Sequence, residues 1–329
     1  MASKNSPGSM LSVTSAQQMF HAVPYHAYSI WLFTFSDLKT IVFPETLFGL
    51  LTALSQTAAG PTATGSAAGI TKLDIIQRSP LVLLWVWINL LPFAINNQRR
   101  PEAIAEDAIN KPWRTMPTGR WSQTQAKNIM AFLYVVAVVF SWRMGGLRSS
   151  LALIGLGFWY NDGGGADVHA LVRNLINALG FTSFGTGALE MALNRRMRFE
   201  PAALMDMGTP SLEKWLIVVA AIVFTTVHTQ DMYDQEGDAQ RGRLTVPLQM
   251  GETTARWAIG VFMPCWGLFC PYFWQCGWLG YALTTPLAAA VAYRSLAFRT
   301  VEEDKTTFRI WNAWMVGLYV LPLIQALSR

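Results

Sequence analysis

His228-Thr-Gln-Asp-Met-Tyr-Asp-Gln-Glu-Gly-Asp-Ala-Gln-Arg-Gly-Arg243 is the stretch that decides the fold, and it follows directly on the apolar run 215–227. Asp231, Asp234 and Asp238 stand three and four residues apart, a spacing that places them on one face of a helix. Three carboxylates on one face repel each other and are costly beside lipid unless a cation neutralises them. The stretch therefore predicts a divalent-metal site at the end of a membrane helix.

The composition indicates a polytopic membrane protein. Of the 329 residues, 52% are hydrophobic and only 14% are charged, whereas soluble domains carry about 25% charged residues. The net charge of +5 is modest and the basic residues lie in loops, so we expect no nucleic-acid partner and no obligate protein partner. Residues 1–27 are polar and Ser-rich without a signal-peptide pattern, which predicts a flexible N-terminus before a single membrane domain, 28–329.

Apolar runs of roughly 20 residues, the length that crosses a bilayer as a helix, predict an all-α bundle of about nine transmembrane helices. They cover residues 42–61, 80–97, 124–142, 149–160, 171–193, 213–230, 255–274, 278–298 and 309–327. Most basic residues follow the even-numbered helices, which places those loops in the cytosol. Without a transit peptide, we expect insertion into the endoplasmic reticulum, with the acidic clusters and the active site at the cytosolic face.

A second acidic cluster follows the second apolar run. Gln98, Glu102, Glu106 and Asn110 recur every four residues, again one helical face, and Asp107 flanks them. Basic residues follow each cluster in a Pro/Gly loop. Carboxylates in this number suit Mg²⁺, which shares its shell with phosphate oxygens, while Arg and Lys take the remaining phosphate charge.

A third polar island, 160–174, adds further candidates, although its Gly-rich turn is equally explained by a tight loop. The candidate metal ligands are carboxylates: Asp231, Asp234, Asp238, Glu102, Glu106, Asp107 and Asp162. The candidate diphosphate contacts are basic or amide side chains: Asn97, Lys111, Arg114, Arg120, Arg173, Asn174, Arg241 and Arg243. The candidate pocket residues are Gln98, Tyr160 and Tyr233. The arginines are explained equally well by the orientation rule for basic loops.

The paired acidic motifs, the loop Asn110-Lys-Pro-Trp-Arg114 and the helix count resemble the UbiA superfamily of intramembrane prenyltransferases. The second motif matches the family pattern, whereas the first has Gln98, Glu102 and the pair Glu106–Asp107 where the family has aspartates. This version is similar to the fungal branch of membrane-bound UbiA-type terpene cyclases. The resemblance implies Mg²⁺ as cofactor, a prenyl diphosphate as substrate, and Asp231, Asp234, Asp238, Glu106 and Asp107 as catalytic residues.

Three functions remain open from the sequence. The first is a terpene cyclase that ionises farnesyl diphosphate and folds the cation into a sesquiterpene hydrocarbon. The second is a prenyltransferase that moves the prenyl group to an aromatic or meroterpenoid acceptor, with the same diphosphate site. The third is a transporter, but transporters place their charges near the membrane midplane, whereas these acids stand at helix ends beside basic loops.

Overall fold

The computed structural model describes residues 23–58, 70–197, 201–206 and 210–328, and within them it contains helices and no strand. The predicted all-α class is confirmed. The long helices are α2 (Phe43–Ala58), α4 (Ser79–Gln98), α6 (Gln123–Met144), α7 (Leu147–Asn161), α8 (Ala170–Leu193), α10 (Leu212–Thr226), α13 (Glu252–Phe273), α14 (Gly277–Ala297) and α15 (Val301–Leu327). Each coincides with one predicted apolar run, apart from residues 59–61, which lie outside the described part.

Helix ends follow ordinary capping chemistry. Ser122 and Gln125 form a capping box at the start of α6. Thr300 caps α15, which begins at Val301, eight residues before the predicted start at 309. Hydroxyl caps of this kind satisfy backbone N–H groups that have no partner inside the helix. The first turn of α15 is charged, so a search for apolar runs places the start of this helix too late.

Five helical segments of the described chain are long and apolar enough to cross a membrane. They are Val23–Ala58, Ser79–Gln98, Gln123–Met144, Leu212–Thr229 and Val301–Leu327. The count of nine spans stays a prediction. The first segment begins at Val23, before the predicted domain boundary at 28, while residues 1–22 of the predicted flexible N-terminus lie outside the described residues.

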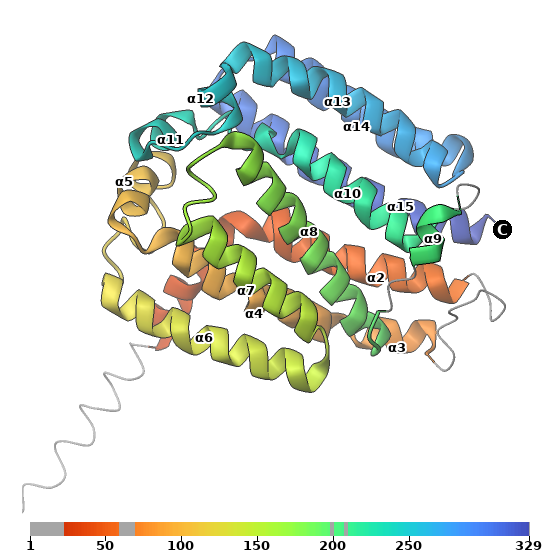
Figure 1. Cartoon of the computed structure of the whole chain (residues 1–329), viewed down its shortest axis with the longest axis horizontal. Coiled ribbons are helices and arrows are strands. Elements are labelled where there is room, and N and C mark those ends of the chain that lie inside the picture. The colour runs from red at the N-terminus through yellow and green to blue at the C-terminus, as the bar shows by residue number, and fades with distance from the viewer. Residues whose placement is uncertain (1–22, 59–69, 198–200, 207–209, 329) are drawn as a thin grey trace, which may run out of the picture.

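Helix α8 lies in the middle of the bundle and packs on α2, α4, α7 and α10 (Figure 1). Small residues allow the close crossings that the sequence predicts. A Cβ on Gly187 would stand 1.9 Å from the ring of Trp85, and one on Gly49 would stand 2.6 Å from the backbone of Ala188. Close backbone approach of this kind is typical of helix packing in membranes.

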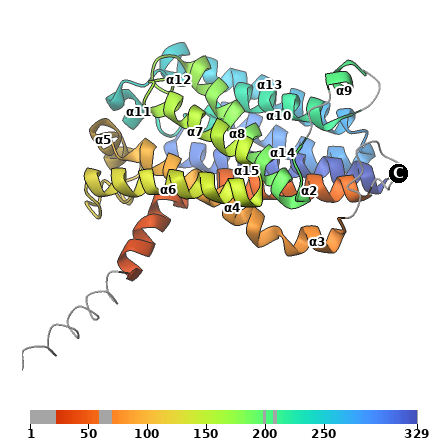
Figure 2. The same ribbon diagram turned by 60° about the horizontal axis from the view of Figure 1, so that its bottom comes forward.

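The short helices divide between the two ends of the bundle (Figure 1). At one end lie α5 (Pro101–Asn110), α11 (Gln235–Arg241) and α12 (Val246–Met250). At the other end lie α3 (Lys72–Gln77), α9 (Pro201–Met205) and the C-terminus. The helical segment that starts at Val23 leaves the bundle at the α5 end (Figure 2). Both acidic motifs therefore lie at one end, as their shared position after apolar helices predicts.

Candidate active site

Helix α11 docks on α5 and thereby brings the two acidic motifs together. The Asn110 side chain donates to the Asp234 carbonyl at 3.0 Å and accepts from the Gly237 N–H at 3.2 Å. A Cβ on Gly237 would stand 2.4 Å from the Asn110 amide nitrogen. Only glycine leaves room for this contact, so Gly237 and Asn110 set the distance between the motifs.

The second motif does not form the single helical face that its spacing predicts. Helix α10 ends at Thr226, a 3₁₀ turn follows at η3 (Val227–Thr229), and Asp234 directly precedes α11. The chain turns between the aspartates, and each is therefore aimed at a different basic side chain. The ion pairs are Asp231 with Arg173 at 2.8 Å, Asp234 with Lys111 at 2.7 Å, and Asp238 with Arg243 at 3.5 Å.

The first motif is also broken, because α4 ends at Gln98 and α5 begins at Pro101. Arg100 between them is extended, with ψ of 151°, as expected for a residue before proline. Gln98 is therefore not on one face with Glu106: it is buried and donates to the Phe33 carbonyl at 2.8 Å. Glu102 lies exposed on α5. Glu102 is on the same helix as Glu106 and Asn110, at the predicted four-residue spacing, so only Gln98 departs from the predicted face.

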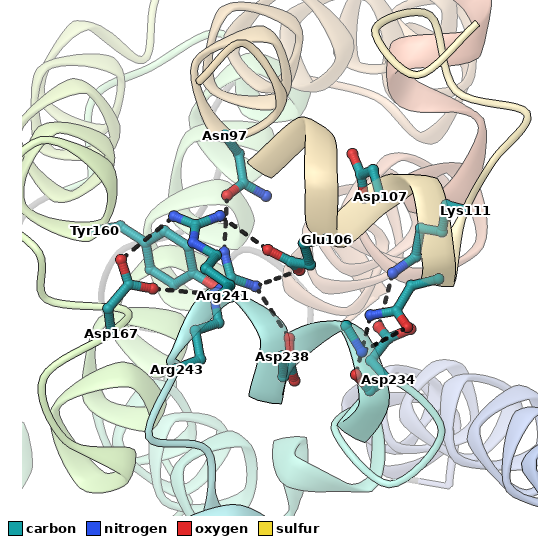
Figure 3. A network of polar contacts seen from close by, with 12 residues as sticks. Asn97, Glu106, Asp107, Lys111, Tyr160, Asp167, Asp234, Asp238, Arg241 and Arg243 are labelled. Carbon is teal, nitrogen blue, oxygen red and sulfur yellow. Dashed lines mark hydrogen bonds and ion pairs between the residues drawn. The ribbon is translucent and has the colours of Figure 1, made fainter. Parts of the chain in front are cut away.

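Glu106 lies at the centre of an ion-pair network (Figure 3). Its two oxygens accept from Arg241 at 3.0 Å and from Arg243 at 2.9 Å. Both arginines also reach Asp167, at 3.3 and 3.0 Å, and Arg243 reaches Asn97 at 3.3 Å. Arg243 thus connects the first motif, the second motif and the third polar island.

Burial and neighbouring charge act differently on two acids of this network. Burial opposes ionisation of Glu106, but the adjacent Arg243 and Arg241 hold its pKa below the ordinary value. For Asp238 burial dominates and raises the pKa to about 7, although Arg173 and Arg243 oppose the shift. Burial therefore outweighs the neighbouring cations at Asp238, whereas the cations outweigh burial at Glu106.

Two further cations face the same region. Lys111 lies at the C-terminus of α5 and holds Asp234 (Figure 3). Arg114, in the loop that follows, holds Asp107 at 2.8 Å. Arg173, near the start of α8, also donates to the hydroxyl of Tyr160. The buried acids Glu106, Asp107, Asp231, Asp234 and Asp238 are therefore each matched by a basic side chain, whereas the exposed Glu102 has no such partner among the described residues.

Several of these side chains line a cavity with an empty volume of about 1080 Å³, its mouth included. Asp107, Asp231, Asp238 and Arg241 are not among its lining residues. Its charged and hydrogen-bonding wall holds Asp37, Asn97, Glu106, Lys111, Arg114, Tyr160, Arg173, Asp234 and Arg243. Its apolar wall, from α4, α7 and α8, holds Leu90, Phe93, Ala94, Leu153, Leu156, Ile176, Phe181 and Phe184, with the amides of Asn89 and Asn177 among them. A cavity with one charged end and one apolar end fits an amphiphilic ligand.

Within the described residues, no three His, Cys, Asp or Glu side chains are grouped closely enough to hold a metal ion. The basic partners occupy most carboxylate oxygens of the two motifs, but two buried ones have no partner. Asp234 Oδ1 and Asp238 Oδ2 are buried without any hydrogen-bond partner. Buried carboxylate oxygens without a donor are costly, and a hard cation with oxygen ligands would satisfy them. The donor set therefore fits Mg²⁺.

Four other predicted site residues lie away from the cavity wall. Arg120 donates to Ser29 at 2.9 Å and stacks on Tyr25, so it fastens the N-terminal helical segment. Asp162 pairs with Arg99 and Arg100 in a separate cluster. The Asn174 amide donates to the Phe224 carbonyl at 2.9 Å. Tyr233 packs beside Phe308, with Lys111 Nζ 5.9 Å from its ring centre.

Sequence reasoning missed two acids that the fold brings to the site. Asp167 lies in the same Gly-rich island as Asp162, and it is Asp167 that bridges Arg241 and Arg243. Asp37 lines the cavity from the N-terminal helical segment. Asp37 is an acid inside an otherwise apolar and aromatic run, and that position could have indicated a functional role.

Comparison with known proteins places this site in a family. The model of the UbiA prenyltransferase family matches residues 81–316. The chain is 28% identical to fumagillin β-trans-bergamotene synthase of Aspergillus fumigatus, over 74% of this chain and 80% of that one. It is 26% identical to somaliensene A/B synthase of Streptomyces somaliensis, over 90% and 91% of the two chains.

Solved structures share the architecture. A UbiA homologue from Archaeoglobus fulgidus, solved with DMAPP and Mg²⁺, aligns over 88% of this chain and 98% of that chain with a TM-score of 0.56 at 14% identity. At this identity the likeness shows the fold alone. Together with the apolar helices, it makes the chain an integral membrane protein. The family match covers most of the chain and includes both acidic motifs, so the protein belongs to the UbiA prenyltransferase family.

Proposed function

We propose that the protein is a membrane-bound terpene cyclase that ionises farnesyl diphosphate and cyclises the cation to a sesquiterpene hydrocarbon. The observation that carries the proposal is the cavity itself, where four basic side chains meet an apolar wall. Lys111, Arg114, Arg173 and Arg243 line its charged end. A prenyl diphosphate has the same division into a multiply charged head and an apolar tail.

The basic side chains suit the leaving group. Arg114 and Arg243 offer guanidinium forks for phosphate oxygens, and Lys111 offers a point charge. All three are now paired with acids, which the diphosphate would partly displace. Positive charge fixed where the leaving diphosphate gains negative charge lowers the barrier to C–O cleavage. Lys111, Arg114 and Arg243 thus form a diphosphate clamp. Glu106 and Asp167 keep Arg243 in place, together with the neighbouring Arg241.

Mg²⁺ would be held chiefly by Asp234 and Asp238, whose free oxygens are buried, with Glu106 and Asn97 beside them. When bound, the ion would neutralise diphosphate charge as a Lewis acid. The A. fulgidus homologue was solved with Mg²⁺ and a prenyl diphosphate, which supports the same cofactor here. Asp231 holds Arg173 and is in this proposal a positioning residue.

The apolar wall suits the cation formed after ionisation. Phe93, Phe181 and Phe184 line it, and aromatic faces attract cations. Such a wall also keeps out water, which would otherwise quench the cation. The two relatives named above are both synthases of terpenes. Because the first is a β-trans-bergamotene synthase, β-trans-bergamotene is the product to look for before any other. The alternative is prenyl transfer to an aromatic or meroterpenoid acceptor, which would use the same clamp.

One assay separates the two functions. The purified protein in detergent or nanodiscs is given Mg²⁺ and farnesyl diphosphate without any acceptor, and the organic extract is analysed by gas chromatography. A cyclase yields a cyclic hydrocarbon together with released diphosphate. Product that forms only after an aromatic acceptor is added would instead establish a transferase. We further propose that the protein resides in the endoplasmic reticulum with the cavity facing the cytosol, as the basic loops indicate.

A further inference from the structure

The helical segment ahead of α2 changes its winding at the cavity. It passes through a 3₁₀ turn, η1 (Phe35–Asp37), and a π turn, η2 (Leu38–Val42). π turns inside helices are rare and frequently occur at functional sites. Asp37, Thr40 and Ile41 of this segment line the cavity. The altered winding therefore presents a carboxylate, a hydroxyl and an apolar side chain to the same space.

Asp37 differs from the other carboxylates of the cavity wall. Glu106 accepts from two arginines and Asp234 from Lys111. Within the described residues, the Asp37 carboxylate has no hydrogen bond and no ion pair, although it is half-buried. The charged groups that face it are Lys39, Asp107, Lys111 and Arg114. Asp107 is already paired with Arg114, and Lys111 with Asp234.

A free carboxylate on this wall is chemically distinct from the clamp. If Lys111 and Arg114 hold the diphosphate, Asp37 cannot bind the same head group, because the two anions repel each other. It does belong to the wall that the reacting end of the prenyl chain would contact. An unpaired, acceptor-only group next to a carbocation can take a proton from it.

We propose that Asp37 is the base that ends the cyclisation; this rests on the proposed cyclase function. The C–O bond breaks first, and diphosphate leaves with its electron pair. After ring closure, a C–H bond beside the cationic carbon breaks, its electron pair forms the new C=C bond, and the proton goes to an Asp37 carboxylate oxygen. The sum is prenyl diphosphate to hydrocarbon, diphosphate and one proton. Asp37 lies ahead of residues 81–316, where the family model matches.

The test compares the full-length wild type with Asp37→Asn, which keeps the shape and removes the basicity. Both are given farnesyl diphosphate and Mg²⁺, and diphosphate release and the extracted terpenes are measured in parallel. Asp74→Asn is the matched control, because Asp74 lies in the capping box of α3 at the other end of the bundle. We expect diphosphate release near the wild-type rate and a hydrocarbon yield lower by about 100-fold, the usual contribution of a positioned base. Terpene alcohols, formed when water captures the cation, would replace the hydrocarbon.

Other outcomes would contradict the proposal that Asp37 is the base. A parallel fall of diphosphate release and hydrocarbon in Asp37→Asn would assign the residue to ionisation, and an unchanged product profile would assign it no chemical role. If the Asn variant does not accumulate in membranes, Asp37→Ser provides the same two readouts. A wild type that releases no diphosphate from farnesyl diphosphate alone would overturn the cyclase function itself. If the wild type makes hydrocarbon and Asp37→Asn gives the same product profile, only the role of Asp37 as the base would be overturned.

Discussion

Substituting Gly180 with leucine should shorten the prenyl chain that the enzyme accepts. Gly180 lines the cavity and lies seven residues after Arg173 on α8, which is about 10 Å deeper at 1.5 Å per residue. A Cβ at Gly180 would meet no atom within 4 Å. The new side chain would therefore enter the cavity without displacing protein atoms, at the depth reached by the distal part of a chain whose diphosphate lies at Arg173.

The expected size of the effect follows from the burial that is lost. A leucine side chain has nearly the bulk of one isoprene unit. Burial of each methylene contributes about 0.8 kcal/mol, so excluding about five carbons costs up to about 4 kcal/mol. Since 1.4 kcal/mol corresponds to a factor of ten, kcat/KM for farnesyl diphosphate should fall by up to about a thousandfold. The value for geranyl diphosphate, which is shorter by that unit, should change little.

The assay measures kcat/KM for farnesyl and geranyl diphosphate by diphosphate release, in the wild type and the variant. Gly155→Leu is the matched control. A Cβ on Gly155 also meets no atom within 4 Å, but Gly155 lies on the exposed face of α7 and does not line the cavity. The reasoning is refuted if Gly180→Leu keeps the wild-type ratio of the two constants, or if Gly155→Leu changes that ratio equally.

Three further predictions concern stability and the cofactor. Arg256→Met should lower the free energy of unfolding by about 3–5 kcal/mol, because Arg256 is the partner of buried Asp304; an unchanged melting temperature would contradict this. Gly187→Ala should lower the free energy of unfolding by about 1–3 kcal/mol through overpacking, because the new Cβ would meet the Trp85 ring. Thermal unfolding measures this, and a higher melting temperature in the variant would contradict the prediction. Chelation of divalent cations should abolish diphosphate release reversibly, with recovery on addition of Mg²⁺; full activity in excess chelator would exclude the metal.

The fold was largely predictable because apolarity and length decide it. The helical segments follow the apolar runs closely, and the boundaries shift only where capping residues or charged turns extend a helix, as at the start of α15. What the sequence could not provide was the direction of side chains at helix ends. A new helix begins at Pro101, so Gln98 turns into the fold and does not share a face with Glu102, Glu106 and Asn110.

The site was predictable in its chemistry and less so in its membership. Opposite charges at one end of the bundle had to pair, which is why Lys111, Arg173 and Arg243 were found together with the aspartates. Which acid pairs with which arginine on a distant segment cannot be read from the residues that surround either one in the sequence. Asp167 therefore takes the bridging place beside the clamp, while Asp162 pairs with a different set of arginines.

The central claim is that the second acidic motif ionises a prenyl diphosphate, and diphosphate release by Asp234→Asn tests it most directly. Wild type, Asp234→Asn and the control Asp74→Asn are purified, and their melting temperatures are compared to show that all three are folded. Each is then given farnesyl diphosphate with Mg²⁺. The account predicts release by the wild type and the control, and a rate at least about 100-fold lower in Asp234→Asn, since the variant loses charge at the reacting group. Wild-type release by Asp234→Asn would contradict the account.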